Sequence, residues 1–357
     1  MKAHLAQQVE RRFQRRLDER GVVYLLGAGA SVCAGLPTMH DLTVKIHRGL
    51  PPDLKEHYDT IRSALQNQLG EGRCLNIEDI LSELLLELAR QSVPQEHRTT
   101  ELFTAITSRV RRLLQSTSTF DHHRRFVKAL CAREGRTVKR RPSPITIATT
   151  NYDLLVETSC EAEQIAWTNG FGGTFRRTWI PGCLACAICE HSGTEWRPIH
   201  RQVLLMKVHG SLSWHTVANG ETRETAQVPT GLRAEQALMI WPHVGKEAAI
   251  LHPPFNDLLK YFERALGCAT VLATSGYGYG DEHLNGKILE WAKAGNGRSL
   301  VCMSKELPVW LSPHREADWL SVLTEDAIIW NGRVEQGKTD LWDFARFSLW
   351  LESSAGG

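Results

Sequence analysis

The feature that most constrains the fold is a run of five apolar residues, Val22–Leu26, followed directly by Gly27-Ala28-Gly29-Ala30-Ser31. A continuous apolar run of this length is typical of a strand buried on both faces of a parallel sheet. The two glycines permit a tight turn and a close approach of the backbone to a ligand. If a helix follows, its free N–H groups would face that ligand, which suits a diphosphate. A glycine turn that binds nothing is the alternative.

Composition and charge narrow the class of protein. The sequence has 42 Lys and Arg against 40 Asp and Glu, so it lacks the basic excess of a nucleic-acid-binding protein, and the basic run 136–141 is typical of a solvated loop. No apolar run approaches the ~20 residues that cross a bilayer, and residues 1–20 hold no signal-peptide core. Nine cysteines without a secretion signal indicate reduced thiols. We therefore expect a soluble, cytoplasmic protein that binds neither membranes nor nucleic acid directly.

Short apolar strands alternate with helices over much of the chain. The expected strands cover residues 22–26, 144–150, 203–208, 237–241, 270–274, 299–302 and 327–330. Helices are expected at 3–20, 255–266, 283–293 and 339–352. This order predicts an α/β fold, with a Rossmann-like, mostly parallel sheet and helices on both faces.

The stretch between the first two strands carries helical signals instead of strand signals. The strongest begins at Asn76, which can cap a helix, and two more follow at 98–115 and 120–133. We therefore expect a helical insertion over residues 41–135. Because it follows the glycine turn directly, it would roof one side of the ligand site, and the alternative is that it only fills space in the fold. It lies within a single domain spanning residues 1–357. A small cysteine-containing module is expected over residues 158–202.

Three polar clusters follow predicted strands at their carboxyl ends. They are Thr149-Thr150-Asn151-Tyr152-Asp153, then residues 207–211, then residues 274–281. Each alone is consistent with a helix cap or a turn. Because ligands of parallel sheets bind at the carboxyl ends of the strands, the three clusters together predict one cleft.

Taken in order, these motifs resemble the sirtuin superfamily. The resemblance rests on the Gly27 turn with Gly35-Leu36-Pro37, on residues 149–153, on His209-Gly210, and on Thr274-Ser275 with the glycines after them. The sequence is most similar to the divergent prokaryotic sirtuin-like proteins that hydrolyse NAD in antiphage defence. Their late motif Gly-Tyr-x-x-x-Asp-x-His-x-Asn corresponds here to residues 276–285.

The resemblance implies that NAD, as the substrate, lies across the cleft. Asn151 would hold a water or a ribose hydroxyl, and His209 would act as general base. Asp153 would orient Asn151 or stabilise positive charge on the ribose, or would only cap a helix. The residues implied to bind NAD are Gly27, Ala28, Gly29, Ala30, Ser31, Gly35, Pro37, Thr150, Thr274, Ser275, Gly276, Tyr277 and Asp281.

The chain departs from the deacylating sirtuins at two places. Thr38-Met39-His40 stands where those enzymes have an Asp-Phe-Arg signature, and one compact cysteine run replaces two separated Cys-x-x-Cys pairs. We therefore expect an NAD glycohydrolase, or NADase, that releases nicotinamide and ADP-ribose and depletes NAD in abortive infection. The alternatives are an NAD-dependent protein deacylase and a non-catalytic sensor of NAD or ADP-ribose.

The cysteine run itself has two interpretations. Cys183, Cys186, Cys189 and His191 could bind a structural zinc ion, with a further ligand such as His200. The intervening residues are apolar, however, so the run could instead be a buried turn.

Control of such an enzyme is expected to come from assembly, because a constantly active NAD hydrolase would kill its own cell. The predicted elements leave too little sequence for a separate sensor domain. We expect a homo-oligomer with a regulatory partner, such as a hexameric DNA-translocating ATPase or an Argonaute-like protein. Five tryptophans near the C-terminus fit either an interface or an aromatic core, namely Trp310, Trp319, Trp330, Trp342 and Trp350.

Overall fold

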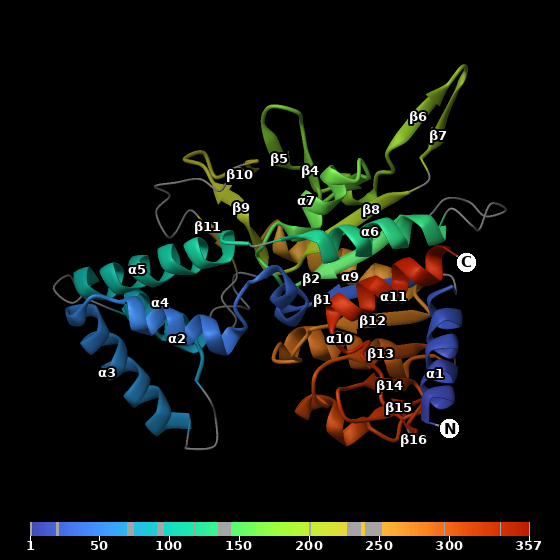
Figure 1. The fold of residues 1–357 in the computed structure, drawn as a ribbon. Coiled ribbons are helices and arrows are strands. Elements are labelled where there is room, and N and C mark those ends of the chain that lie inside the picture. The colour runs from blue at the N-terminus through green and yellow to red at the C-terminus, as the bar shows by residue number, and fades with distance from the viewer. Residues whose placement is uncertain are drawn as a thin grey trace.

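The computed structural model describes residues 2–18, 21–69, 75–90, 96–117, 119–134, 144–199, 201–226, 237–239, 252–295, 297–335 and 337–356. Within these ranges, nine strands form the largest sheet (Figure 1). Their order is β16 (Arg333–Glu335), β15 (Ile328–Trp330), β14 (Leu320–Leu323), β13 (Ser299–Met303), β12 (Val271–Ser275), β1 (Val22–Leu26), β2 (Ile145–Thr149), β8 (Gln202–Lys207) and β3 (Ala166–Thr168).

Strand β1 is central in this sheet and pairs in parallel with β12 on one side and β2 on the other. All neighbouring strands from β3 to β14 are parallel, and only the edge strands β15 and β16 pair antiparallel. Side chains of β1 alternate between two cores, with Tyr24 and Leu26 in one and Val23 and Leu25 in the other. The predicted mostly parallel sheet with a strand buried on both faces is confirmed.

Helices cover both faces of the sheet, as predicted. One core includes side chains of α1 (Lys2–Leu17), α6 (Asp121–Glu134), α7 (Leu155–Ala162) and α11 (Phe344–Gly356), and Figure 1 shows α6 and α11 side by side. The other core includes side chains of α9 (Phe255–Cys268), α10 (Glu282–Lys293) and the 3₁₀ helix η4 (Val309–His314). Four of the C-terminal tryptophans pack in or against these cores, which favours the aromatic-core interpretation: Trp310, Trp319, Trp330 and Trp350. None of the helices described is both long and apolar enough to cross a membrane.

Four helices between β1 and β2 build a core of their own. They are α2 (Met39–Gly49), α3 (Pro52–Leu69), α4 (Ile77–Arg90) and α5 (Glu96–Gln115). The sequence predicted α4 and α5, whose apolar stripes are long, but it gave no separate signal for α2 and α3. Helix α6 packs against α11 and β2 and so belongs to the main sheet. The domain limits 1–357, 41–135 and 158–202 stay a prediction.

Five strands form a second, smaller antiparallel sheet within the described residues. Its order is β11 (Ala237–Met239), β9 (Gly210–Thr216), β10 (Thr222–Glu224), β5 (Arg177–Trp179) and β4 (Phe171–Gly172). Strand β11 was expected in the parallel sheet but pairs with β9, which starts directly after His209. A hairpin of β6 (Cys189–Ser192) and β7 (Glu195–Pro198) is separate from both sheets.

The turns after β1 and β12 are in direct backbone contact. The N–H of Gly29 donates to the carbonyl of Gly276 at 2.9 Å, and the N–H of Gly27 donates to the carbonyl of Ser275 at 3.0 Å. A Cβ on Gly29 would lie 2.7 Å from the Cα of Gly276. A Cβ on Gly276, whose φ is +63°, would lie 2.2 Å from the nitrogen of Ala30. These glycines therefore permit one backbone to pack on another.

We predict that Gly276→Ala lowers the free energy of unfolding by about 2 kcal/mol or more, because the new Cβ meets backbone and the positive φ disfavours a side chain. Gly278→Ala is the matched control, since a Cβ there meets nothing within 4 Å. Urea unfolding of the two variants and the wild type measures the difference. Equal stability of the two variants would show that this contact is not tight.

Candidate active site

A cavity of about 830 Å³ lies at the carboxyl ends of β1, β2, β8 and β12. Residues of α2, α4 and the end of α5 line its other side, so the helical cluster covers the cleft as expected. Eleven of the predicted site residues line this cavity: Gly27, Ala28, Ser31, Pro37, Thr150, Asn151, Asp153, His209, Gly276, Tyr277 and Asp281.

The remaining predicted NAD-binding residues do not line the cavity and have structural contacts instead. Gly35 ends the 3₁₀ helix η1 (Ala28–Ala34) in the left-handed conformation with φ 84°. Thr274 is buried in β12, where its hydroxyl lies 2.9 Å from that of Tyr279. Gly29 packs on Gly276 as described above. The other two residues in this group, both buried, are Ala30 and Ser275.

The turn after β1 differs from the expected phosphate-binding helix start. The helix that follows is a 3₁₀ helix of seven residues. Two of its early N–H groups are used within the protein: that of Gly29 donates to the carbonyl of Gly276, and that of Ala30 donates to the carbonyl of Gly27, both at 2.9 Å. The sequence pattern could not reveal this, because the acceptor Gly276 is distant in the chain.

Asn151 is held in one orientation by two hydrogen bonds from its side-chain amide. The amide nitrogen donates to the carbonyl of Gly27 and to the hydroxyl of Ser31, both at 2.9 Å. Because the carbonyl of Gly27 can only accept, the NH₂ group must face it. The Oδ1 atom of Asn151 is therefore directed away from these partners and can accept a hydrogen bond from a ligand.

Asp153 acts on Asn151 through Ser31. The Ser31 hydroxyl donates to Oδ2 of Asp153 at 2.7 Å, and Oδ1 accepts from the N–H of Leu155 at 3.1 Å in the first turn of α7. The carboxylate thus accepts from an N–H group at the start of α7, and it also orients the Ser31 hydroxyl that Asn151 contacts. These contacts are compatible with two of the interpretations of Asp153, orientation of Asn151 and a helix cap, while a role in stabilising charge on the ribose stays a prediction.

His209 and Asp281 form a buried pair in the lining of the cavity. Nε2 of His209 lies 2.7 Å from Oδ2 of Asp281, and both side chains are less than a tenth exposed. The other carboxylate oxygen accepts from the N–H of Leu284, so Asp281 is also the N-cap of α10. A carboxylate at Nε2 favours the neutral imidazole with its proton there, which makes Nδ1 the basic nitrogen.

The charge of the cavity lining is one-sided. Among the described residues, four carboxylates line it, those of Glu78, Asp153, Asp281 and Glu282, and this part of the lining holds no lysine or arginine. These carboxylates favour a cationic group placed beside them.

Lining residues that were not predicted from the sequence include Glu78, Tyr279 and Trp310. Glu78 lies in the first turn of α4. The side-chain oxygen of Asn76 caps this helix by accepting from the N–H of Glu78 at 2.7 Å. Tyr279 and Trp310 stack with ring centroids 5.6 Å apart. The cap on α4 was visible in the sequence, but its position over the cavity depends on tertiary packing.

Comparison with known proteins identifies the family. The SIR2-like domain model matches residues 145–323, about half of the chain. The chain belongs to the SIR2-like family. This confirms the predicted membership of the sirtuin-like superfamily. A search of curated proteins gives no match.

Solved structures of Sir2 homologues are similar over nearly the whole chain. A mutant Sir2 homologue in complex with ADP-ribose has 14% identity and a TM-score of 0.49, covering 97% of this chain and 96% of that one. A second ADP-ribose complex has 13% identity and a TM-score of 0.47, with the same coverage. A complex with 2'-O-acetyl ADP-ribose has 14% identity and a TM-score of 0.44, covering 95% and 96%.

The cysteine run of this SIR2-like protein does not assemble the predicted metal ligands. Cys183 begins the 3₁₀ helix η2 (Cys183–Ala185), Cys186 and Cys189 are exposed, and the ring of His191 packs on Trp196 at 5.0 Å. No three His, Cys, Asp or Glu side chains within the described ranges are grouped to hold a metal ion. The arrangement therefore does not fit a zinc site of these four residues. His200 and the basic run 136–141 lie outside the described residues.

We predict that Ser31→Ala lowers the free energy of unfolding by about 1–3 kcal/mol, since it removes the donor to a buried oxygen of Asp153. Ser353→Ala is the control, because its hydroxyl is exposed and contacts only its own helix. Chemical denaturation compares the two. An unchanged stability of Ser31→Ala would show that the link between Asn151 and Asp153 is weak.

Proposed function

We propose that this SIR2-like protein is an NAD glycohydrolase that cleaves NAD to nicotinamide and ADP-ribose. The observation that carries the proposal is the placement of Asn151 and His209 on one cavity whose charged lining is otherwise acidic. The bond to be broken joins the ribose to a pyridinium cation, and positive charge develops on the ribose as it breaks. An acidic cavity favours both charges.

The residues have complementary roles in the proposed reaction. Oδ1 of Asn151 accepts a hydrogen bond from the attacking water or from a ribose hydroxyl. The water oxygen bonds to the ribose carbon while the bonding pair of the glycosidic bond passes to the pyridinium ring, which leaves as neutral nicotinamide. The proton of the water passes to His209, and Asp281 at 2.7 Å stabilises the resulting imidazolium.

The shape of the lining supports one position for NAD. Gly27 and Ala28 present backbone with little side chain, which leaves room for the diphosphate. The nicotinamide end then lies toward Asn151 and His209. The departure from the deacylase signature at Thr38-Met39-His40 supports hydrolysis over deacylation.

Incubation of the purified protein, residues 1–357, with NAD alone tests the activity. We expect nicotinamide release, reduced about a hundred-fold or more by Asn151→Ala or His209→Ala and about ten-fold by Asp281→Asn. Asp326→Asn is the matched control for Asp281→Asn, because this exposed carboxylate pairs with Lys338 and does not line the cavity. Mass spectrometry of the products identifies ADP-ribose.

Three other outcomes would contradict the proposal. Substantial turnover by both Asn151→Ala and His209→Ala would show that their roles are misassigned. Nicotinamide release only with an acyl-lysine peptide would indicate a deacylase. Binding of ADP-ribose by calorimetry without turnover would indicate a sensor.

We further propose that the NADase is a cytoplasmic, homo-oligomeric antiphage protein controlled by a partner, such as a hexameric DNA-translocating ATPase or an Argonaute-like protein. The resemblance to prokaryotic defence proteins supports this role. We expect cellular NAD to fall after phage infection of cells that carry the wild type but not Asn151→Ala. Control by assembly would be contradicted if light scattering shows a monomer at micromolar concentration and this monomer hydrolyses NAD at a full, constant rate.

A further inference from the structure

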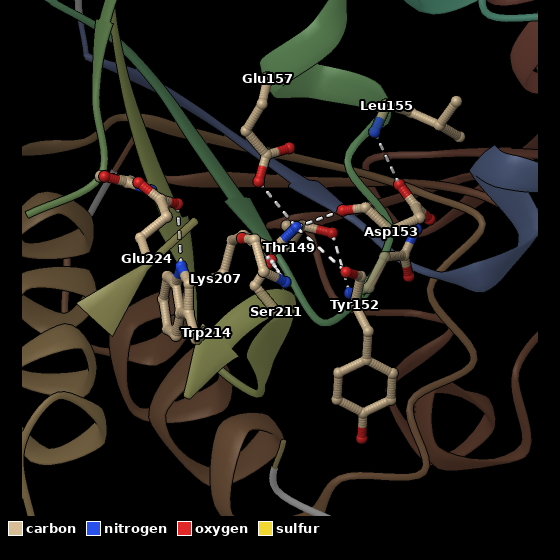
Figure 2. Close-up of polar contacts among 12 residues, drawn as sticks. Thr149, Tyr152, Asp153, Leu155, Glu157, Lys207, Ser211, Trp214 and Glu224 are labelled. Atoms are coloured by element: carbon tan, nitrogen blue, oxygen red, sulfur yellow. Dashed lines mark hydrogen bonds and ion pairs between the residues drawn. The ribbon is translucent and has the colours of Figure 1, made fainter. Parts of the chain in front are cut away.

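A lysine is completely buried behind the Asn151 loop. Lys207 is the last residue of β8, two positions before His209, and its side chain is 0% exposed. Its ammonium donates to Oε1 of Glu157 at 2.9 Å, to the carbonyl of Tyr152 at 3.5 Å and to the carbonyl of Asp153. Figure 2 shows these contacts converging on the lysine nitrogen.

Stability alone does not explain a charge in this position. Removing both ions from water offsets most of their attraction, so a buried ion pair contributes little net stability. Burial raises the pKa of Glu157, and the ammonium of Lys207 opposes that rise. The charges of this pair therefore add little net stability at this position.

The acceptors of the ammonium lie in the segment that carries the predicted catalytic residues. The chain leaves β2 at Thr149 and enters α7 at Leu155, and the carbonyls of Tyr152 and Asp153 turn inward between these points. The N–H of Leu212 also donates to the Tyr152 carbonyl at 3.0 Å. Among the hydrogen bonds of the described residues, the carbonyl of Asp153 accepts only from Lys207.

The same lysine is rigidly connected to His209. Strand β8 is paired in register with β2 as far as Lys207 opposite Thr149, and the N–H of Val208 donates to the carbonyl of Thr149 at 3.1 Å. The lysine side chain then crosses from β8 to the segment after β2. One side chain thus connects the two strand ends that carry Asn151 and His209.

We propose that Lys207 is a positioning residue that fixes the Asn151–Asp153 segment relative to His209, with Glu157 as its counter-ion. This inference rests on the proposed NADase function for its kinetic consequence. Its structural consequence, an ordered segment over residues 150–154, is independent of any activity.

The test compares two double variants that each remove a buried carboxylate together with its cation. We call the contacts of the Lys207 ammonium with Glu157 and with the carbonyls of Tyr152 and Asp153 the clamp. Lys207→Met with Glu157→Gln removes the clamp without leaving an unpaired charge. Arg177→Met with Glu224→Gln is the matched control, because it removes the pair between Arg177 and Glu224, 2.7 Å apart, outside the Asn151 segment. Thermal unfolding gives the folded fraction of each variant.

The expected result is a split between kcat and KM. Per folded molecule, we expect the Lys207 double variant to lose about ten-fold or more in kcat for nicotinamide release, with KM for NAD changed less than about three-fold. The control double variant should keep its kcat, whatever its stability. Equal kcat values in the Lys207 double variant and the wild type would overturn the proposal.

Hydrogen exchange separates a failure of this inference from a failure of the proposed function. We expect peptides covering residues 150–154 to exchange slowly in the wild type and at least about ten-fold faster in the Lys207 double variant. If the wild type releases no nicotinamide, the NADase proposal fails. The hydrogen-exchange comparison still shows whether Lys207 orders residues 150–154. Unchanged exchange in the Lys207 double variant overturns the clamp.

A folding failure of the Lys207 double variant would still leave the proposal testable. Lys207→Met with Glu157→Leu supplies an apolar pair in the same space for the same measurements. The wild type alone also tests the proposal. If its amide hydrogens over residues 150–154 exchange as fast as those at the exposed turn around Asn219 and Gly220, the clamp is overturned.

Discussion

The hydrogen bonding of β1 to both β2 and β12 is the constraint on which the site depends. Leu26 is in register with Thr149 on one side and Ser275 on the other, so three chain segments leave the sheet at the same level. The segments that follow must then share one space. Glycines at 29 and 276 let two of them touch backbone to backbone, and the third supplies Asn151, whose amide contacts the first.

Two carboxylates connect the helices of the fold to the site. Asp153 accepts from the first turn of α7 and from Ser31, while Asp281 accepts from the first turn of α10 and lies beside His209. In each case one carboxylate oxygen accepts from an N–H group at a helix N-terminus, and the other contacts a polar side chain that lines the cavity. A helix that shifted would therefore move a site residue with it, which makes the packing of α7 and α10 part of the site's geometry.

The sequence predicted the parts of this arrangement that depend on local pattern. The strands around the site are short apolar runs with polar residues at their carboxyl ends, and both features are visible within about ten residues. The contact between Gly29 and Gly276 could not be predicted, because the two residues are distant in the chain. Glu78 and the Lys207–Glu157 pair were missed for the same reason: α4 covers the cavity, and β8 pairs with β2, only through tertiary packing. Helices α2 and α3 escaped detection because their stability comes from a core shared with α4 and α5.

The placement of Lys207 also preserves the one-sided charge of the cavity. A lysine in the lining would hold the Asn151 segment equally well, but its cation would oppose a pyridinium group in the same space. Behind the segment, the ammonium is paired with Glu157 at 2.9 Å and is shielded from the cavity by the backbone it contacts. The pair has no net charge, so its field falls off faster with distance than that of a single ion. The segment is thereby held by a cation while the lining keeps its carboxylates as the dominant charges.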